Sequence, residues 1–240
     1  MEKLALIVPA YNEEKRIEKM LLAYSSYFES LKKKKVIDYN ILVVINNTQD
    51  KTEEKVKLIE KKNHNISHFV LKEKGKGNAI IQGFNRALKS NSSLIGFVDA
   101  DLATTPESFY DLILNIKDTD GTIANRHHPF SKIFSKGNYL RKILSKILNI
   151  LVFILFSFRY SDTQCGAKLF TRSAIEKLIP KLSEKGWIID IDLLYQSKLL
   201  NLNIQEVPTI WYEVKGSKLN PLIDSINMLL DIIKYRLKLK

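Results

Sequence analysis

The sequence predicts an α/β protein with a mostly parallel sheet and helices on both of its faces. Short apolar runs alternate with longer amphipathic segments, and this βαβαβ order is typical of parallel strands joined by right-handed crossovers. The chain has 240 residues, 45% of them hydrophobic. That is enough for one large domain with a full core or for two small ones. We expect a single domain that spans residues 1–240.

The expected strands are apolar runs bounded by turn residues. They lie at residues 4–8, 39–45, 66–71, 94–98, 121–126 and 205–214, with a further one after the polar turn at 162–166. Pro9 is expected to end the first strand, because proline cannot donate to a ladder. The helix that follows is predicted by apolar residues at helical spacing, namely Ile17, Met20, Leu21, Tyr24, Phe28 and Leu31.

Two aspartates one residue apart follow the apolar run at 94–98. Side chains alternate along a strand, so Asp99 and Asp101 should leave it on the same side while Ala100 turns away. Open α/β sheets bind ligands just outside the carboxyl ends of their strands. Two carboxylates there suit Mg²⁺ or Mn²⁺ bridging a diphosphate. The plainer alternative is a strand end with solvated aspartates.

Three further turns carry candidate binding residues. Tyr11 and Glu13 follow the first strand, where they either touch a nucleotide base or ribose or, in the case of Glu13, favour a helix start through its dipole. Lys76 lies between two glycines at a helix start, which can hold phosphate through backbone N–H groups and charge; an ordinary loop is the alternative. Asp190 and Asp192 lie at another predicted helix start, where either could be a cap.

Charge and hydropathy indicate an anionic partner and an interfacial surface. The formal net charge is +12, which fits nucleic acid, acidic lipid or a phosphorylated substrate. The predicted helix at 138–158 is basic at first and then almost wholly apolar, as in helices that lie among lipid headgroups; a core or dimer-forming helix is the alternative. The predicted amphipathic helix at 222–240 has a similar cationic profile. The apolar run at 147–158 is shorter than the roughly 20 residues that cross a bilayer.

Two features of the sequence indicate where in the cell the protein works. The single cysteine, Cys165, fits a reducing compartment. The chain starts with Met1 and continues directly into a predicted strand, without a stretch resembling a signal peptide. We therefore expect a cytoplasmic location.

The order of these elements resembles the GT-A fold of the family 2 glycosyltransferases over nearly the whole chain. The turns at 9–14, 75–77 and 99–101 are similar to motifs that the superfamily shares widely. More specific are the stretches at 162–172, 187–190 and 216–219, which resemble the dolichyl-phosphate glucosyltransferase and mannosyltransferase branch, the glucosyl type most closely. The resemblance implies a Rossmann-like, mostly parallel mixed sheet with helices on both faces, plus amphipathic membrane-interface helices.

The resemblance also implies an activity. It is the inverting transfer of a hexose, glucose first and mannose next, from UDP-glucose or GDP-mannose to a polyprenyl (dolichyl) phosphate at the cytoplasmic face of the cell or ER-type membrane. The implied partners are the nucleotide sugar, the lipid phosphate and the membrane surface, with a possible homodimer and no nucleic acid. The alternatives are a sugar nucleotidyltransferase, which the acidic, glycine-free turn at 9–14 disfavours, and a non-enzymatic basic protein that binds membranes or nucleic acid.

Family roles carry over to matching positions of this sequence. Asp99 and Asp101 match the metal ligands, and Asp101 and Asp190 match the catalytic positions. The donor site implied in this way comprises Pro9, Tyr11, Glu13, Asn46, Lys76, Asp99, Ala100 and Asp101, and the acceptor-phosphate site comprises Arg126, Arg141, Ser145 and Lys218. The chain departs from the family at 45–48, where Ile-Asn-Asn-Thr replaces the usual Asp-Asp-Gly-Ser. An asparagine can donate as well as accept and has no charge, so the donor stays open.

Overall fold

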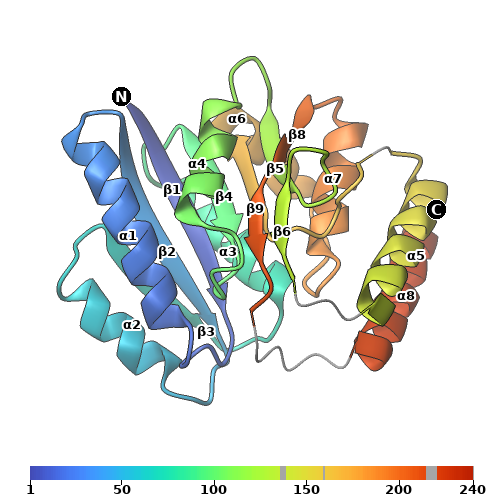
Figure 1. Ribbon diagram of the computed structural model, residues 1–240, viewed down its shortest axis with the longest axis horizontal. Helices are drawn as coiled ribbons and strands as arrows, with labels where there is room; N and C mark the ends of the chain where they lie inside the picture. Colours follow the sequence, from blue (N-terminus) through green and yellow to red (C-terminus); the bar gives the residue numbers. More distant parts are fainter. Residues whose placement is uncertain (136–138, 159, 215–220, 240) are drawn as a thin grey trace.

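The structure is a computed structural model that describes residues 1–135, 139–158, 160–214 and 221–239, and of residues 139–146 and 221–226 the backbone only. Within these residues a seven-stranded sheet of order β3-β2-β1-β4-β7-β5-β8 forms the centre (Figure 1). Neighbouring strands are parallel except around β7, which is antiparallel to both β4 and β5. The predicted mostly parallel mixed sheet is confirmed.

The bounds of the elements are as follows. The strands of the central sheet are β1 (Glu2–Ala10), β2 (Ile37–Asn46), β3 (Ile66–Leu71), β4 (Leu94–Val98), β5 (Gly121–Asn125), β7 (Ala167–Thr171) and β8 (Ile204–Pro208), and a separate ribbon pairs β6 (Lys132–Phe134) with β9 (Ile210–Tyr212). The helices are α1 (Ile17–Lys33), α2 (Thr52–Glu60), α3 (Lys76–Ala87), α4 (Pro106–Leu114), α5 (Tyr139–Phe156), α6 (Arg172–Leu178), α7 (Ile189–Leu199) and α8 (Pro221–Lys238).

Two predictions of strand extent are wrong. The first strand continues through Pro9 to Ala10; beyond Ile7 it pairs with β2 only, and a strand position with one free side tolerates proline. The expected strand at 205–214 divides into β8 and β9 around Thr209. The backbone N–H of Thr209 donates to Ser131 Oγ and its carbonyl accepts from the N–H of Lys132, so the chain leaves the central sheet there and pairs with β6.

Each face of the sheet has its own core. On one face α1, α2 and α4 bury apolar side chains such as Tyr24, Val56 and Phe109. On the other face α3, α6 and α7 do the same, for example with Phe84 and Leu193. The alternation of side chains along the strands thus separates these two cores, one under each set of helices.

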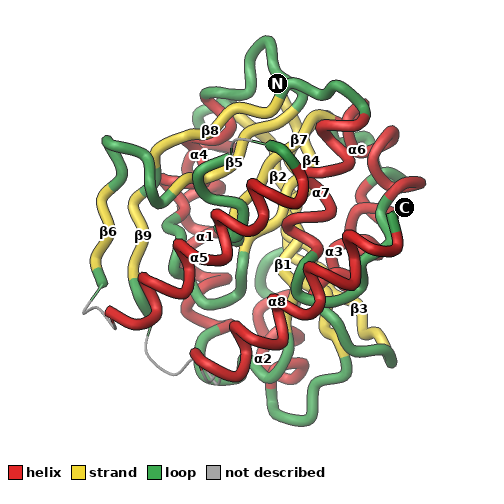
Figure 2. The backbone as a smooth tube through the Cα atoms, turned by 90° about the vertical axis from the view of Figure 1, so that its right-hand side faces the viewer, coloured by secondary structure: helices red, strands yellow, loops and turns green. Residues whose placement is uncertain are grey.

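Helices α5 and α8 lie side by side at one end of the molecule (Figures 1 and 2). Their buried faces pack together and against α7 through residues that include Val152, Phe156, Leu194, Ile232 and Tyr235. Their opposite faces are apolar as well but exposed, with Ile147, Ile150, Phe153 and Ile154 on α5 and Leu230, Ile233 and Leu237 on α8. The alternative of a core helix is therefore right for only one face of α5.

Across the part of the chain that the structure describes, none of the helices is both long enough and apolar enough to cross a membrane.

Candidate active site

Polar residues from four strands meet at the carboxyl edge of the sheet. The residues that mark the face under α3 and α7 are Ile7, Val44, Phe97 and Phe170. Pro9, Asn46, Asp99 and Lys168 each lie two positions from one of them and so project to the same face. Lys168 reaches this edge because β7 runs antiparallel and begins where β4 ends. Ala100 belongs to the opposite core, so it turns away as predicted.

A chain of alternating charges crosses this edge. Lys76, the first residue of α3, places Nζ 2.9 Å from Asp99 Oδ1 and 3.2 Å from Asp190 Oδ2. Lys168 Nζ lies 2.5 Å from the other oxygen of Asp190. Asp190 is therefore paired on both oxygens. It does not cap α7, whose first residue before the helix is Ile188, so the plain cap reading of Asp190 is wrong.

The two lysines set the charge state of Asp190. Burial alone would raise the pKa of this carboxyl, but the charges and hydrogen bonds of Lys168 and Lys76 outweigh burial and hold the pKa below its ordinary value. Asp99 behaves in the opposite way. Burial, together with the negative charges of Asp101 and Asp190, raises the pKa of Asp99 although Lys76 acts against the change. Asp190 thus stays ionised and is a poor acceptor for a proton at neutral pH.

Asp101 lies in a tight turn beside Asp99. Its Oδ1 accepts the backbone N–H of Ala103 at 3.0 Å, which closes a turn in which Leu102 has a left-handed φ of 62°. The Asp99 side chain is 41% exposed. Two carboxylates from one turn fit a small divalent cation that takes its other oxygens from a diphosphate and water. Of the described residues, no group of three or more His, Cys, Asp or Glu side chains could hold a metal ion.

Gly166 makes room for the Asp99 carboxylate. The N–H of Asp99 donates to the Gly166 carbonyl at 2.9 Å, which extends the pairing of β4 and β7 by one step. A Cβ atom added to Gly166 would lie 1.8 Å from Asp99 Oδ2. The polar turn before β7 therefore has a glycine where the acidic side chain must pass.

Two backbone N–H groups of the turn around Lys76 already have partners within the chain. The N–H of Gly77 donates to the Gly186 carbonyl and that of Asn78 to the Lys185 carbonyl, each at 3.0 Å. Gly75 has a left-handed φ of 127°, and a Cβ there would lie 2.2 Å from the Lys185 carbonyl oxygen. The glycines thus let the loop before α7 approach α3. The N–H groups of Gly77 and Asn78 therefore do not form part of a phosphate cradle, and a phosphate site that uses the rest of the turn and the Lys76 side chain stays a prediction.

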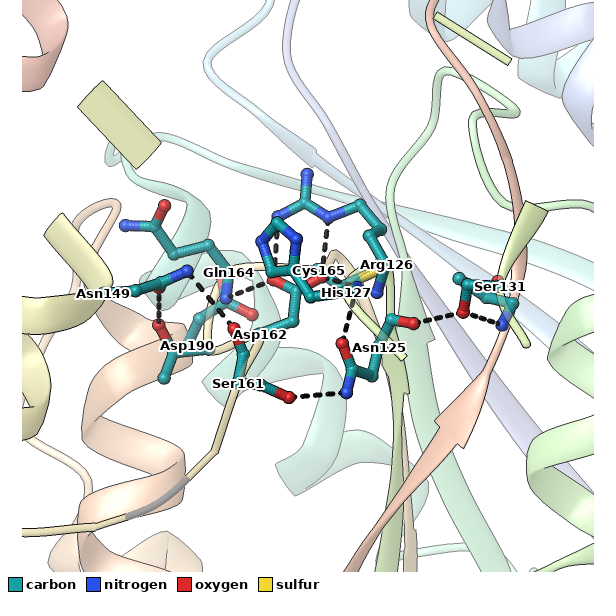
Figure 3. Close-up of polar contacts among 12 residues, drawn as sticks. Asn125, Arg126, His127, Ser131, Asn149, Ser161, Asp162, Gln164, Cys165 and Asp190 are labelled. Atoms are coloured by element: carbon teal, nitrogen blue, oxygen red, sulfur yellow. Dashed lines mark hydrogen bonds and ion pairs between the residues drawn. The ribbon is translucent and has the colours of Figure 1, made fainter. Parts of the chain in front are cut away.

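Arg126, which the resemblance places at the acceptor phosphate, forms an ion pair with the buried Asp162 (Figure 3). Arg126 Nε donates to Asp162 Oδ2 at 2.7 Å and Nη2 donates to Oδ1 at 2.8 Å. The guanidinium also lies 5.5 Å from the ring centroid of Trp211. Burial opposes ionisation of Asp162, but Arg126 overcomes it and lowers the pKa of that carboxyl to about 2. The arginine is therefore held in one orientation from two sides.

The other residues expected at the acceptor phosphate lie outside what the structure describes. Arg141 and Ser145 are on α5 in the part without described side chains, and Lys218 is among the residues that are not described. Their convergence with Arg126 stays a prediction.

One residue that the resemblance places at the nucleotide-sugar site, Asn46, has a buried side-chain oxygen without a hydrogen bond among the described residues. Asn46, at the end of β2, is 4% exposed, and its Oδ1 is the buried side-chain oxygen that has no hydrogen-bond partner among the described residues. Such an atom is costly unless a ligand supplies a donor. Tyr11, which follows β1, is exposed, with Lys74 Nζ 5.9 Å from its ring centroid. Glu13 instead receives two hydrogen bonds of 2.6 Å from Arg16.

An antiparallel strand within an otherwise parallel sheet, with an acidic pair at the carboxyl edge, is the arrangement expected of a glycosyltransferase with the GT-A fold. Residues 5–179 match the family model described as glycosyl transferase family 2. The chain belongs to that family and is a glycosyltransferase.

Several curated relatives are similar over almost the whole chain. The dolichyl-phosphate beta-glucosyltransferase of Dictyostelium discoideum is 36% identical, over 98% of this chain and 74% of the relative. The enzymes of the same name from Saccharomyces cerevisiae and Homo sapiens are 32% and 30% identical, over 98% and 99% of this chain and 74% and 76% of the relatives.

Solved structures share the fold at low sequence identity. Glucosyl-3-phosphoglycerate synthase from Mycobacterium tuberculosis, in complex with Mn²⁺, uridine diphosphate and phosphoglyceric acid, superposes with a TM-score of 0.69 at 17% identity, over 98% of this chain and 78% of that one. The same enzyme in complex with Mn²⁺, UDP-glucose and phosphoglyceric acid superposes with a TM-score of 0.70 at 17% identity, over 98% of this chain and 79% of that one. These likenesses confirm the predicted GT-A architecture.

Replacing Gly166 by alanine is expected to displace the Asp99 carboxylate. We expect calorimetry to show at least a tenfold loss of affinity for UDP in the presence of Mn²⁺, about 1.4 kcal/mol. Gly186→Ala is the matched control, because a Cβ there meets nothing within 4 Å, and its affinity should stay within about twofold of the parent. Equal affinities for the two alanine variants, both folded by circular dichroism, would contradict the role of Gly166.

Proposed function

We propose that this glycosyltransferase moves glucose from UDP-glucose to dolichyl phosphate, or a related polyprenyl phosphate, with inversion at the anomeric carbon. The observation that carries the proposal is the acidic pair Asp99 and Asp101 at the sheet edge, where Asp99 contacts Lys76. The names of the curated relatives support glucose and the lipid phosphate, and the neighbours that contain UDP support a uridine donor.

On the donor side, the residues of this chain bind and orient a nucleoside diphosphate sugar. The free oxygens of Asp99 and Asp101 would hold Mg²⁺ or Mn²⁺, which when bound stabilises negative charge on the leaving diphosphate. Lys76 supplies a further positive charge next to the acidic pair. The unsatisfied Oδ1 of Asn46 accepts a hydrogen bond from the base or ribose of the nucleotide.

On the acceptor side, a phosphate oxygen attacks the anomeric carbon. The new bond joins that carbon to the acceptor phosphate, and the bond to the donor diphosphate breaks. A phosphate monoester is mostly ionised at neutral pH, so the nucleophile does not need a general base. Asp190, which the lysines keep ionised, orients the sugar or stabilises positive character at the anomeric carbon. Arg126, with Arg141, Ser145 and Lys218 as predicted from the family, fixes the acceptor phosphate against the repulsion between two anions.

The exposed apolar faces of α5 and α8 hold the protein to the cytoplasmic face of an ER-type membrane in this proposal. The lipid tail of the acceptor stays in the bilayer, so the enzyme must reach its phosphate from the surface. Ile150, Ile154 and Leu237 are exposed apolar side chains on these helices, and a net charge of +12 favours anionic headgroups. A homodimer stays a prediction.

A donor panel tests the transfer itself. Purified protein with Mn²⁺ and dolichyl phosphate in vesicles should form a glycolipid with UDP-glucose, and less or none with GDP-mannose. Asp101→Asn should lower kcat by about 10²–10³-fold because the divalent cation that stabilises the leaving diphosphate loses a charged ligand, while the Oδ1 of the new side chain can still accept from the N–H of Ala103. Asp111→Asn, an exposed change on α4, is the control and should keep full activity.

The same panel separates the alternative functions. Formation of a nucleotide sugar from a sugar phosphate and a nucleoside triphosphate, without any glycolipid, would instead indicate a nucleotidyltransferase. Tight DNA binding without any transfer would indicate a non-enzymatic basic protein.

Charges on the exposed face of α5 are expected to weaken membrane binding. Ile150 and Ile154 lie one turn apart, and burying such side chains in lipid contributes roughly 1.5–3 kcal/mol each. The double change Ile150→Glu and Ile154→Glu should therefore lower cosedimentation with phosphatidylcholine–phosphatidylserine vesicles by at least about tenfold. Leu58→Glu on α2 is a control of similar exposure, 60% against 65% for Ile154. An equal loss of vesicle binding in the control, or unchanged binding of the double variant, would contradict the role of this face of α5 in membrane binding.

A further inference from the structure

Lys168 is a wholly buried ammonium group beneath the active site. Its side chain is 0% exposed. Nζ donates to Asp190 Oδ1 at 2.5 Å, to the Cys165 carbonyl at 2.8 Å and to the Thr163 carbonyl at 3.2 Å. An ammonium group has three donors, so each one has an acceptor. Lys168 is therefore fixed between α7 and the polar turn that precedes β7.

Lys76 binds the same aspartate in a different way. It contacts the opposite oxygen of Asp190 and is shared with Asp99. Its side chain is 11% exposed, and it comes from the first residue of a helix rather than from the interior of a strand. Lys76 is thus the cation that can exchange partners, and Lys168 is the one that cannot.

We propose that Lys168 is a positioning residue that keeps the Asp190 carboxylate fixed and ionised when Lys76 turns to the donor diphosphate. Asp190 is almost fully buried. If Lys76 turned away and Lys168 were absent, no cation would pair with Asp190, and burial would favour the protonated form of its carboxyl group. A protonated Asp190 could no longer stabilise positive character at the anomeric carbon. The proposal rests on the proposed function, because it assigns Lys76 to a diphosphate donor.

The sign of the pH effect follows from the charged groups that face Asp190. These are Lys168 from β7, Lys76 from α3 and the negative charge of Asp99 at the end of β4. Removing the charge of Lys168 takes a cation away from a buried carboxylate, so the pKa of Asp190 rises whether Lys76 faces Asp190 or the diphosphate. Since only the ionised carboxylate serves the reaction, activity would then be lost at a higher pH as the solution is acidified.

Carbon-13 NMR of the aspartate carboxyl groups tests this directly, with Asp190→Asn to assign the signal. In the presence of UDP and Mg²⁺, Lys168→Met should raise the titration midpoint of the Asp190 carboxyl signal by at least about one pH unit, a tenfold change in the protonation constant. Lys168→Arg, which keeps the charge, should shift it less. The acid limb of the pH profile of kcat should move by the same amount, with KM for UDP-glucose changed by less than about threefold.

A double-mutant cycle separates positioning from a purely structural role. Lys168→Met should lower kcat strongly in the parent and hardly at all in the Asp190→Asn background. An unchanged Asp190 midpoint, or equal losses of kcat in both backgrounds, would overturn the proposal. If Lys168→Met alone does not fold, the double variant decides. A folded double variant with the kcat of Asp190→Asn supports the proposal, and an unfolded one overturns it.

The NMR titration does not require transfer. A parent protein that makes no glycolipid would therefore refute the proposed function, while the Asp190 midpoints in the parent and in Lys168→Met would still show whether Lys168 controls this carboxylate.

Discussion

The structure depends on the alternation of two lysines with two aspartates at the carboxyl edge of the sheet. Asp99, Asp101 and Asp190 bring three negative charges to one place, and unit charges 4 Å apart interact by about 4 kcal/mol at an effective dielectric constant of 20. Lys76 and Lys168 offset this repulsion. The four paired residues come from β4, α3, β7 and α7, so the charge chain exists only when all four elements are in place.

Local patterns in the sequence were sufficient for most elements and for the acidic residues of the site. The apolar spacing of α1 and the run that becomes β3 predict those elements with correct bounds or nearly so. Asp99 and Asp101 could be recognised because a buried strand ends directly before them. Asp190 could be found only as a polar residue at a helix start. In each of these cases the signal lies within about ten residues of the chain.

Contacts between distant segments could not be predicted in this way. Lys168 occupies an ordinary alternating position of β7, and its partner Asp190 lies 22 residues further along; a lysine inside an otherwise apolar strand was the available signal. Asp162 pairs with Arg126 across 36 residues. Some exceptions to local rules lie at the carboxyl edge of the sheet. Asn12, Asn47 and Leu102 there have left-handed backbones, and Asn46 keeps an unsatisfied oxygen, as is common at functional sites.

Binding of Mn²⁺ without nucleotide, followed by the paramagnetic resonance of the free ion, tests the charge chain most directly. If Lys76 occupies Asp99 until a donor arrives, Lys76→Met should bind Mn²⁺ about tenfold more tightly than the parent, roughly 1.4 kcal/mol, because a competing ammonium group is gone. UDP should narrow or reverse that difference, since Lys76 then assists the diphosphate. An Mn²⁺ affinity of Lys76→Met equal to or below that of the parent would contradict the pairing of Lys76 with Asp99.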